Sequence, residues 1–286
     1  EFKFLLETVA PLDALSALPH FEEATPDTVY AIIDESAKFA TDVLDPLNWS
    51  GDQEGAKHHG ADNSVTTPKG FKAAYDGYCG MGGAALPMPA EFGGLGMPRS
   101  LITLTDEIVH SSNMSFGLLP MLTQGAIEAI LLAGSDTLKQ TYLPKMVSGE
   151  WTGTMNLTEP QAGSDLALVK TRAEQQADGT FKIFGTKIFI TFGEHDFTSN
   201  IIHLVLARLP DAPEGVKGIS LFVVPKFLVN ADGSLGARND AHCVSIEHKL
   251  CIHGSPTCVM QFGDNGGATG YVVGEENRGL EYMFVM

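Results

Sequence analysis

Turn-forming and hydrogen-bonding residues are concentrated at positions 157–168, LTEPQAGSDLAL, at the end of an apolar run. Gly163, Ser164 and Asp165 favour a tight bend, because glycine tolerates positive φ and because Ser and Asp side chains bond to nearby backbone groups. Successive N–H groups in such a bend can converge on an anion. The segment therefore predicts a ligand-binding turn, with a purely structural turn between extended segments as the alternative.

The other residue types that could do chemistry indicate weaker sites. The four cysteines, Cys79, Cys243, Cys251 and Cys258, show no CxxC pairing. Three histidines lie close in the sequence to the last three of them: His242, His248 and His253. A metal site there is possible on residue type alone, but buried neutral side chains are the favoured interpretation, so no metal ligand is assigned. The Gly-rich segment 80–98 matches neither common phosphate-binding glycine motif, and no strand precedes it, so it predicts an interdomain loop.

The charge balance restricts the class of partner. The chain has 286 residues and a formal net charge of −17, which argues against nucleic acid or an anionic membrane. An anionic ligand stays compatible, because backbone N–H groups and helix ends act locally. The first residues lack the basic start and cleavage site of a signal peptide, and no apolar run approaches membrane-spanning length. A reducing, cytoplasmic compartment is expected.

Helical periodicity dominates the first half of the chain. Thr25, Pro26 and Asp27 are typical of a helix start, with a capping threonine before proline at the first helical position. Apolar residues then recur at helical spacing as far as residue 44. Residues 45–67 are polar and aperiodic and predict a surface loop. Further segments predict a short helix, an irregular loop and three longer helices: 68–79, 80–98, 101–110, 114–133 and 135–147.

Strand periodicity dominates the second half. Four runs rich in β-branched and aromatic residues predict strands, 181–192, 201–209, 218–225 and 257–262, and Asp-Gly predicts a hairpin turn at 176–180. Helices followed by strands favour separate domains over a parallel βαβ sheet. We therefore predict a helical domain over 1–150, a β domain over 151–273, and the start of a helical domain over 274–286. The last residues, GLEYMFVM, have an apolar, helix-like pattern without a stop signal and indicate a truncated chain.

The order of these motifs resembles the FAD-dependent acyl-CoA dehydrogenase family. The resemblance rests on TEPQAGSD, KIFIT, GISLFVVP, HKLCIHGSPT and VVGEENRGLEY, which follow one another in this order. PMPAEFGGLG at 87–96 is similar to a Pro-Glu-Glu-Tyr-Gly-Gly loop of the family, and residues 134–165 follow the family pattern closely. KIFITFGEHD and the extended N-terminal region are most similar to the branch that contains 3-methylmercaptopropionyl-CoA dehydrogenase.

This resemblance implies an α+β multidomain fold: an N-terminal helical domain, a middle domain like a β-barrel or sandwich, and a C-terminal four-helix domain that is missing from this chain. It implies FAD as the cofactor, bound with the acyl-CoA thioester between the middle and C-terminal domains. A glutamate of the C-terminal domain would remove the α-proton while the β-hydrogen passes to the flavin as hydride. That general base is expected beyond Met286, so the catalytic residue stays unknown and the chain alone is expected to be inactive.

The product implied is a trans-2-enoyl-CoA, with electrons leaving through an electron-transferring flavoprotein. A homodimer or homotetramer is implied, because family members meet across subunits near the flavin. Two other functions stay open: a flavin-dependent oxidase or monooxygenase on the same fold, and a catalytically dead binding fragment.

The family pattern assigns cofactor contacts to two segments. The first comprises Met155, Asn156, Leu157, Thr158, Gly163 and Ser164, and Ser164 is also implied to bind the neighbouring CoA. Leu157 and Thr158 would donate hydrogen bonds to the flavin pyrimidine edge, where negative charge develops. The second comprises Phe189, Ile190 and Thr191, with Thr191 near flavin N5. The family usually has Trp where this chain has Phe189, so any hydrogen bond of the indole N–H is lost. The alternation of Ile188, Ile190 and Phe192 itself favours core packing.

Other residues of these motifs are expected to have structural roles. Glu159 lies within the flavin-binding turn and is badly placed as a general base, which must approach from the opposite face of the substrate. Asp165 is expected to fix the turn. His253, where many family members carry Arg, is expected near the domain interface. A row of apolar residues is assigned to the acyl pocket by analogy and to plain core by spacing: Met114, Phe116, Leu118, Leu119, Met121 and Leu122.

Overall fold

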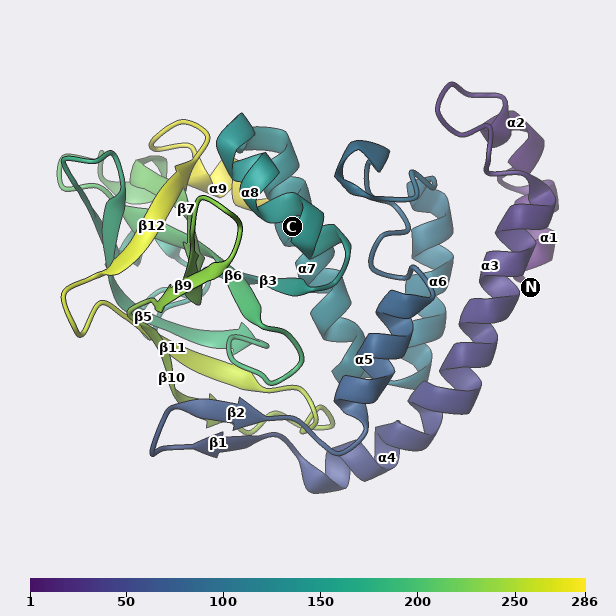
Figure 1. Ribbon diagram of the computed structural model, residues 1–286, viewed down its shortest axis with the longest axis horizontal. Helices are drawn as coiled ribbons and strands as arrows, with labels where there is room; N and C mark the ends of the chain where they lie inside the picture. Colours follow the sequence, from purple (N-terminus) through teal and green to yellow (C-terminus); the bar gives the residue numbers. More distant parts are fainter.

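The computed structural model describes residues 1–286, the side chain of Asp13 excepted. Helices spread out on one side of a β domain, and α7 lies between the two parts (Figure 1). The helices are α1 Phe2–Thr8, α2 Leu12–Ser16, α3 Pro26–Phe39, α4 Asp45–Glu54, α5 Phe71–Gly80, α6 Arg99–Ser112, α7 Met114–Ala133, α8 Asp136–Val147 and α9 Gly279–Met283. A π-helical stretch, Ala40–Leu44, joins α3 to α4, and 3₁₀ turns lie at Ala90–Phe92, Leu166–Leu168 and Gly215–Gly218.

The longest strands are β5 and β6, with eleven and nine residues. They are β1 Lys57–His59, β2 Ser64–Thr66, β3 Trp151–Asn156, β4 Arg172–Gln175, β5 Phe181–Thr191, β6 Asn200–Arg208, β7 Ile219–Pro225, β8 Phe227–Val229, β9 Leu235–Arg238, β10 Ala241–Glu247, β11 Thr257–Phe262 and β12 Ala268–Val273. Four predicted strands are confirmed as β5, β6, β7 and β11. β3, β4, β8, β9, β10 and β12 are not among the predicted strands: β4, β8 and β9 have only three or four residues, and Gly interrupts β3 and β12.

Helix starts follow the predicted capping chemistry. The Thr25 hydroxyl accepts a hydrogen bond from the Thr28 N–H at 3.3 Å, so α3 begins as expected. The Ser135 hydroxyl accepts from Leu138 N–H at 3.3 Å at the start of α8. Each cap satisfies an N–H group that has no partner within the helix. The irregular segment at 80–98 is confirmed, apart from its one 3₁₀ turn.

The predicted surface loop at 45–67 is wrong, because α4 and the β1–β2 hairpin occupy most of it. Gly51 of α4 packs against Phe71: a Cβ added there would lie 2.5 Å from a ring carbon. His58 Nε2 of β1 lies 2.9 Å from the Cys243 carbonyl oxygen of β10. Contacts with residues far along the chain therefore stabilise a segment whose own pattern is not periodic.

The main sheet closes on itself over part of its width. Its strand order is β10-β11-β5-β12-β7-β6-β3, and β4 pairs with both β5 and β6. The pairings of β6 with β3 and with β4 are parallel, and the others are antiparallel. Because β4 connects β5 to β6, the strands β5, β12, β7, β6 and β4 form a closed ring of pairings. The expected barrel-like middle domain is thus confirmed, with a helical domain before it.

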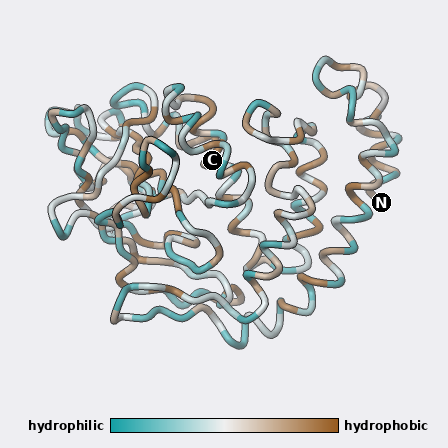
Figure 2. Tube along the Cα trace, in the orientation of Figure 1, coloured by the Kyte–Doolittle hydropathy of each residue, from teal (hydrophilic) through white to brown (hydrophobic). Residues whose placement is uncertain are grey.

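The core explains the apolar character of α7. The helix is 20 residues long with a mean hydropathy of 1.6, so it is long and apolar enough to cross a membrane by composition alone. The prediction that no apolar run approaches that length is therefore wrong. In the fold, 67% of its apolar window is buried. Gly153 of β3 packs against it, since a Cβ there would lie 2.4 Å from the Ala126 Cβ. Figure 2 shows hydrophilic residues along the outer loops, the β1–β2 hairpin and parts of the outer helices.

Candidate functional site

The two segments with predicted cofactor contacts lie side by side. The Ile188 N–H donates to the Thr158 carbonyl oxygen at 2.9 Å. Lys187 Nζ donates to the Leu157 carbonyl oxygen at 3.1 Å. The first segment follows β3, and the second is the C-terminal end of β5 (Figure 1). Residues about thirty positions apart in the sequence thus form one continuous surface, which the sequence pattern alone did not establish.

The first segment is a tight turn. Glu159 and Ala162 exchange two backbone hydrogen bonds, each 3.0 Å long. The Asp165 carboxylate accepts the Ala167 N–H at 3.0 Å and starts the 3₁₀ turn that follows. The structural role expected for Asp165 is therefore confirmed. The adjoining Gly163 and Ser164 are exposed at the surface.

Glu159 is the internal support of this turn. Only 3% of the residue is exposed, and its carboxylate accepts hydrogen bonds from Lys170 N–H at 2.8 Å, Thr171 N–H at 3.0 Å and Lys187 Nζ at 2.8 Å. Burial would raise the pKa of this carboxyl, but the ammonium charge and the hydrogen bonds lower it to about 2. Glu159 is therefore an ionised structural group, as expected from its place in the turn.

The outer side of the turn presents N–H groups. Among the described residues, the main-chain N–H groups of Thr158, Gly163 and Ser164 have no backbone acceptor. Unpaired donors of this kind match the electron-rich pyrimidine edge and the pyrophosphate of FAD. The donor set of the first segment therefore fits the cofactor that the resemblance implies.

Phe189 has a strained backbone and an exposed side chain. Its φ is +59°, a region that non-glycine residues rarely adopt, and 48% of the residue is exposed. The strain coincides with a β-bulge, because Ile188 and Phe189 of β5 lie opposite the single residue Val259 of β11. The bulge turns the ring outward, with the Lys249 ammonium 5.6 Å from its centroid. An outward aromatic ring suits contact with a flat ligand such as a flavin.

Not every predicted side chain reaches this surface. Asn156 is fully buried and Ile190 is 2% exposed, so only their main chains are available to a ligand. The Asn156 amide donates to the Thr154 hydroxyl at 2.8 Å, and that hydroxyl lies 2.8 Å from His203 Nδ1. Burial lowers the pKa of His203 to about 3, so this imidazole is neutral. Met155, Leu157, Thr158 and Thr191 are partly exposed.

Lys187 is the residue at this site that sequence reasoning missed. It is 0% exposed, and it lies on the buried face of β5 together with Phe181 and Ile183. The available signal was its position: a lysine four residues from Ile183 and six from Phe181 faces inward with them in a strand and requires a buried partner. That partner, Glu159, lies in a different motif, which is why local periodicity could not identify the pair.

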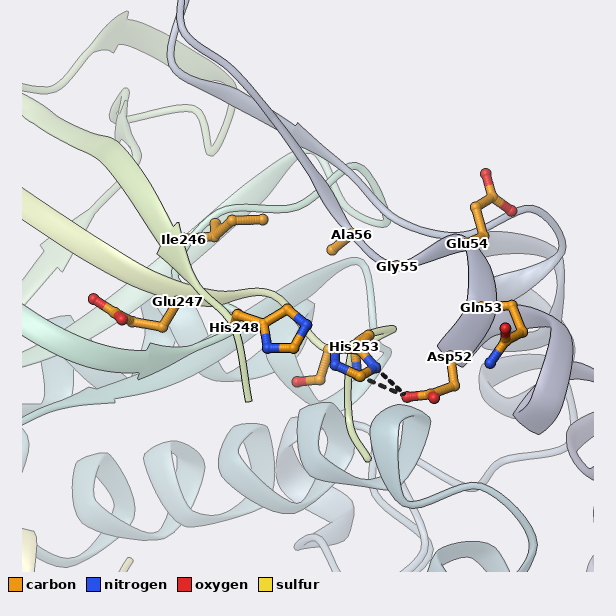
Figure 3. Close-up of a pocket in the computed structure, with 10 residues that line it drawn as sticks. Asp52, Gln53, Glu54, Gly55, Ala56, Ile246, Glu247, His248 and His253 are labelled. Carbon is orange, nitrogen blue, oxygen red and sulfur yellow. Dashed lines mark hydrogen bonds and ion pairs between the residues drawn. The ribbon is translucent and has the colours of Figure 1, made fainter. Parts of the chain in front are cut away.

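The helical part and the β domain meet around a separate cavity of about 470 Å³ (Figure 3). There the Asp52 carboxylate accepts from the His253 main-chain N–H at 3.1 Å and lies 2.8 Å from Nδ1 of the same residue. The His248 ring lies beside the His253 ring, with 4.3 Å between centroids. The expected interface position of His253 is confirmed. None of the predicted cofactor residues lines this cavity.

The apolar row on α7 divides between core and surface. Phe116, Leu119 and Leu122 are buried, as expected for plain core. Met114 and Met121 are instead 46% and 42% exposed. Core packing therefore explains only part of this row.

The sequence matches two domain profiles of one family in the expected order. Residues 29–150 match the acyl-CoA dehydrogenase N-terminal domain, and residues 154–265 match the acyl-CoA dehydrogenase middle domain. The chain is 51% identical, over all of its length, to 3-methylmercaptopropionyl-CoA dehydrogenase of Ruegeria pomeroyi, of which it covers 48%. It is 42% identical to a butyryl-CoA dehydrogenase of Syntrophomonas wolfei, over 91% of this chain and 44% of that protein.

Solved structures share the fold. Butyryl-CoA dehydrogenase from Megasphaera elsdenii superposes with a TM-score of 0.71 at 22% identity, over 90% of this chain and 61% of that one. An acyl-CoA dehydrogenase from Bacillus anthracis complexed with FAD gives a TM-score of 0.71 at 22% identity, over 92% of this chain and 40% of that one. The chain spans about half the length of the curated relatives it matches. By its two domain profiles, its motifs and its fold, the chain belongs to the acyl-CoA dehydrogenase family.

Proposed function

We propose that this chain is the FAD-binding and acyl-CoA-binding part of an acyl-CoA dehydrogenase that converts an acyl-CoA to its trans-2-enoyl-CoA. The observation that carries the proposal is the joined surface of the two cofactor segments. It combines unpaired N–H donors at Thr158 and Ser164 with the outward ring of Phe189. The high identity to 3-methylmercaptopropionyl-CoA dehydrogenase supports it.

The residues of this surface would hold FAD in two ways. The N–H groups of Thr158, Gly163 and Ser164 would bind its electron-rich edge and pyrophosphate, while Phe189 and Thr191 would contact the ring system. Main-chain atoms of Met155, Asn156, Leu157 and Ile190 would complete the contact. Bound FAD would supply the hydride acceptor for the β-hydrogen of the acyl thioester. Ser164 would also bind the CoA.

The proton abstraction needs a base outside this surface. Glu159 is ionised but enclosed by hydrogen bonds, so it has no access to a substrate α-proton. We propose that the general base is a glutamate beyond Met286. The surface described here then binds and orients the cofactor and the thioester, and it leaves the proton transfer to the other side of the substrate.

We propose a short acyl chain as the substrate class. Three relatives above 40% identity carry names that specify short acyl groups, one 3-methylmercaptopropionyl and two butyryl. We further propose an electron-transferring flavoprotein as the electron acceptor, a homodimer or homotetramer as the assembly, and the cytoplasm as the compartment.

The test uses the full-length protein. We expect it to purify with a flavin spectrum that bleaches anaerobically with 3-methylmercaptopropionyl-CoA or butyryl-CoA and yields the matching enoyl-CoA by mass spectrometry. Palmitoyl-CoA is the control and should bleach the flavin at least tenfold more slowly. Failure to bind flavin would overturn the proposal, and hydrogen peroxide formed at full rate without an electron-transferring flavoprotein would favour an oxidase.

A further inference from the structure

Lys187 is a buried cation with two acceptors on the flavin-facing turn. Its Nζ donates to Glu159 Oε1 at 2.8 Å and to the Leu157 carbonyl oxygen at 3.1 Å. The lysine side chain is 0% exposed, and Glu159 also accepts two main-chain N–H groups. A buried ion pair with its hydrogen bonds satisfied retains both charges. The ammonium is therefore a fixed positive charge directly behind the turn.

The geometry of one peptide group connects this charge to the open surface. The Leu157 carbonyl and the Thr158 N–H belong to the same peptide, and the chain has no cis peptide bond. In a planar trans peptide the two groups point in opposite directions. Because the carbonyl points inward to Lys187, the Thr158 N–H points away from it. Among the described residues this N–H has no backbone acceptor.

The ammonium also changes the strength of that N–H as a donor. Hydrogen bonds in series polarise one another, and a charged donor on the carbonyl polarises the peptide more than a neutral one. The next peptide is held as well, since the Thr158 carbonyl accepts from Ile188 N–H at 2.9 Å. Glu159 balances the charge of Lys187 but does not contact the Leu157 carbonyl itself.

We propose that Lys187 is a positioning residue that orients and polarises the Leu157–Thr158 peptide, so that the Thr158 N–H binds reduced FAD more tightly than oxidised FAD. This inference rests on the proposed function. Reduction adds negative charge to the pyrimidine edge, and a stronger donor stabilises that charge. The role goes beyond holding the turn in place, because it predicts a shift in the flavin potential with a defined sign.

The test compares variants of the full-length protein by FAD affinity and by the two-electron midpoint potential of the bound flavin. In Lys187→Met we expect the affinity ratio of reduced to oxidised FAD to fall about tenfold, which corresponds to a potential about 30 mV lower. In Glu159→Gln, burial lowers the pKa of Lys187 with no carboxylate left to oppose it, so the ammonium loses its proton at neutral pH and the potential should fall as well. A weaker affinity for reduced FAD with little change for oxidised FAD, in both variants, identifies an electrostatic role, whereas a merely structural pair would weaken the affinity for both flavin states alike.

Lys226→Met is the matched control. Lys226, partly exposed, forms an ion pair with the buried Glu194 in the same domain and has no hydrogen bond to either cofactor segment. It should lower stability and leave the affinity ratio unchanged. If Lys187→Met does not fold, the neutral pair Lys187→Met with Glu159→Gln replaces it, and a fall in the ratio is expected there too.

An unchanged affinity ratio in a folded, FAD-binding Lys187 variant would overturn the inference, and so would a potential that rises in Lys187→Met. A wild-type protein that does not bind FAD at all would instead overturn the proposed function. The two failures are therefore distinguishable.

Discussion

Two consecutive stretches of the chain, residues 187–191 and 192–197, use similar residues for different purposes. Each contains an aromatic residue with positive φ, Phe189 at +59° and Phe192 at +50°. Each is also tied to a Lys–Glu ion pair: Lys187 with Glu159, both buried, and Lys226 with Glu194, of which only the glutamate is buried. The first stretch carries its aromatic ring at the surface and its ion pair under the cofactor turn.

The second stretch faces inward. Phe192 is 1% exposed and lies 5.7 Å from the ring of Phe197, which stacks on Tyr75 of α5 at 5.4 Å. The Glu194 carboxylate accepts hydrogen bonds from Lys226, which follows β7, and from Arg238, the last residue of β9. The comparison shows that backbone strain and a Lys–Glu ion pair do not identify a functional site by themselves. What distinguishes the first stretch is the direction of its ring and the turn that its lysine contacts.

The two stretches should differ most in how much stability the protein loses when the glutamate of each ion pair is replaced by alanine. Glu159→Ala leaves Lys187 fully buried with one remaining acceptor, so we expect the free energy of unfolding to fall by about 3–5 kcal/mol. Glu194→Ala leaves Lys226 and Arg238, which are partly exposed and can reach water, so the loss should be about 1–3 kcal/mol. Urea denaturation of the two variants measures both values. An equal or larger loss in Glu194→Ala would contradict this account of the pairs.

Acid should weaken the first stretch through Glu159. The folded-state pKa of about 2 lies below the ordinary value of 4.5, so the ionised carboxylate stabilises the fold above pH 4.5. This stability, about 3 kcal/mol, is lost as the pH falls from 4.5 through 2. Between about pH 5 and pH 3, the free energy of unfolding should fall much less in Glu159→Gln than in the wild type, as measured by urea denaturation. Parallel losses in the two proteins would assign the acid sensitivity to other carboxylates.

Local patterns predicted the elements that depend on neighbouring residues. The capped starts of α3 and α8, the β-branched strands β5, β6, β7 and β11, and the turn at Asp165 all follow from residues close together in the sequence. The resemblance to the family predicted which of these segments contact the cofactor. The error at 45–67 has a different origin, because α4 depends on packing between Gly51 and Phe71 that no local pattern contains.

The candidate site was predictable in position but not in its internal chemistry. Glu159 and Lys187 lie in separate motifs, and only the pairing of the first turn with β5 brings them to 2.8 Å. The outward ring of Phe189 depends on the register between β5 and β11, where two residues face one. Register and long-range ion pairs are set by the whole sheet, so they cannot be read from either strand alone.

The smallest change in stability is expected for Phe189→Gly, and this substitution distinguishes Phe189 most clearly from Phe192. Glycine adopts positive φ without strain, so Phe189→Gly relieves backbone strain while losing only a half-exposed ring. We expect its free energy of unfolding to stay within about 1 kcal/mol of the wild type, while FAD affinity falls at least about tenfold through the lost ring contact. Urea denaturation and flavin fluorescence titration measure the two effects on the same samples.

Phe192→Gly is the matched control, three residues further along and with the same sign of φ. It empties a buried position between His195 and Phe197, so the loss of about 3–5 kcal/mol should dominate any relief of strain. Its FAD affinity should be close to that of the wild type under conditions in which it is folded. If Phe189→Gly lost stability on the scale of Phe192→Gly, the ring of Phe189 would belong to the core. The outward ring would then no longer set the first stretch apart from the second.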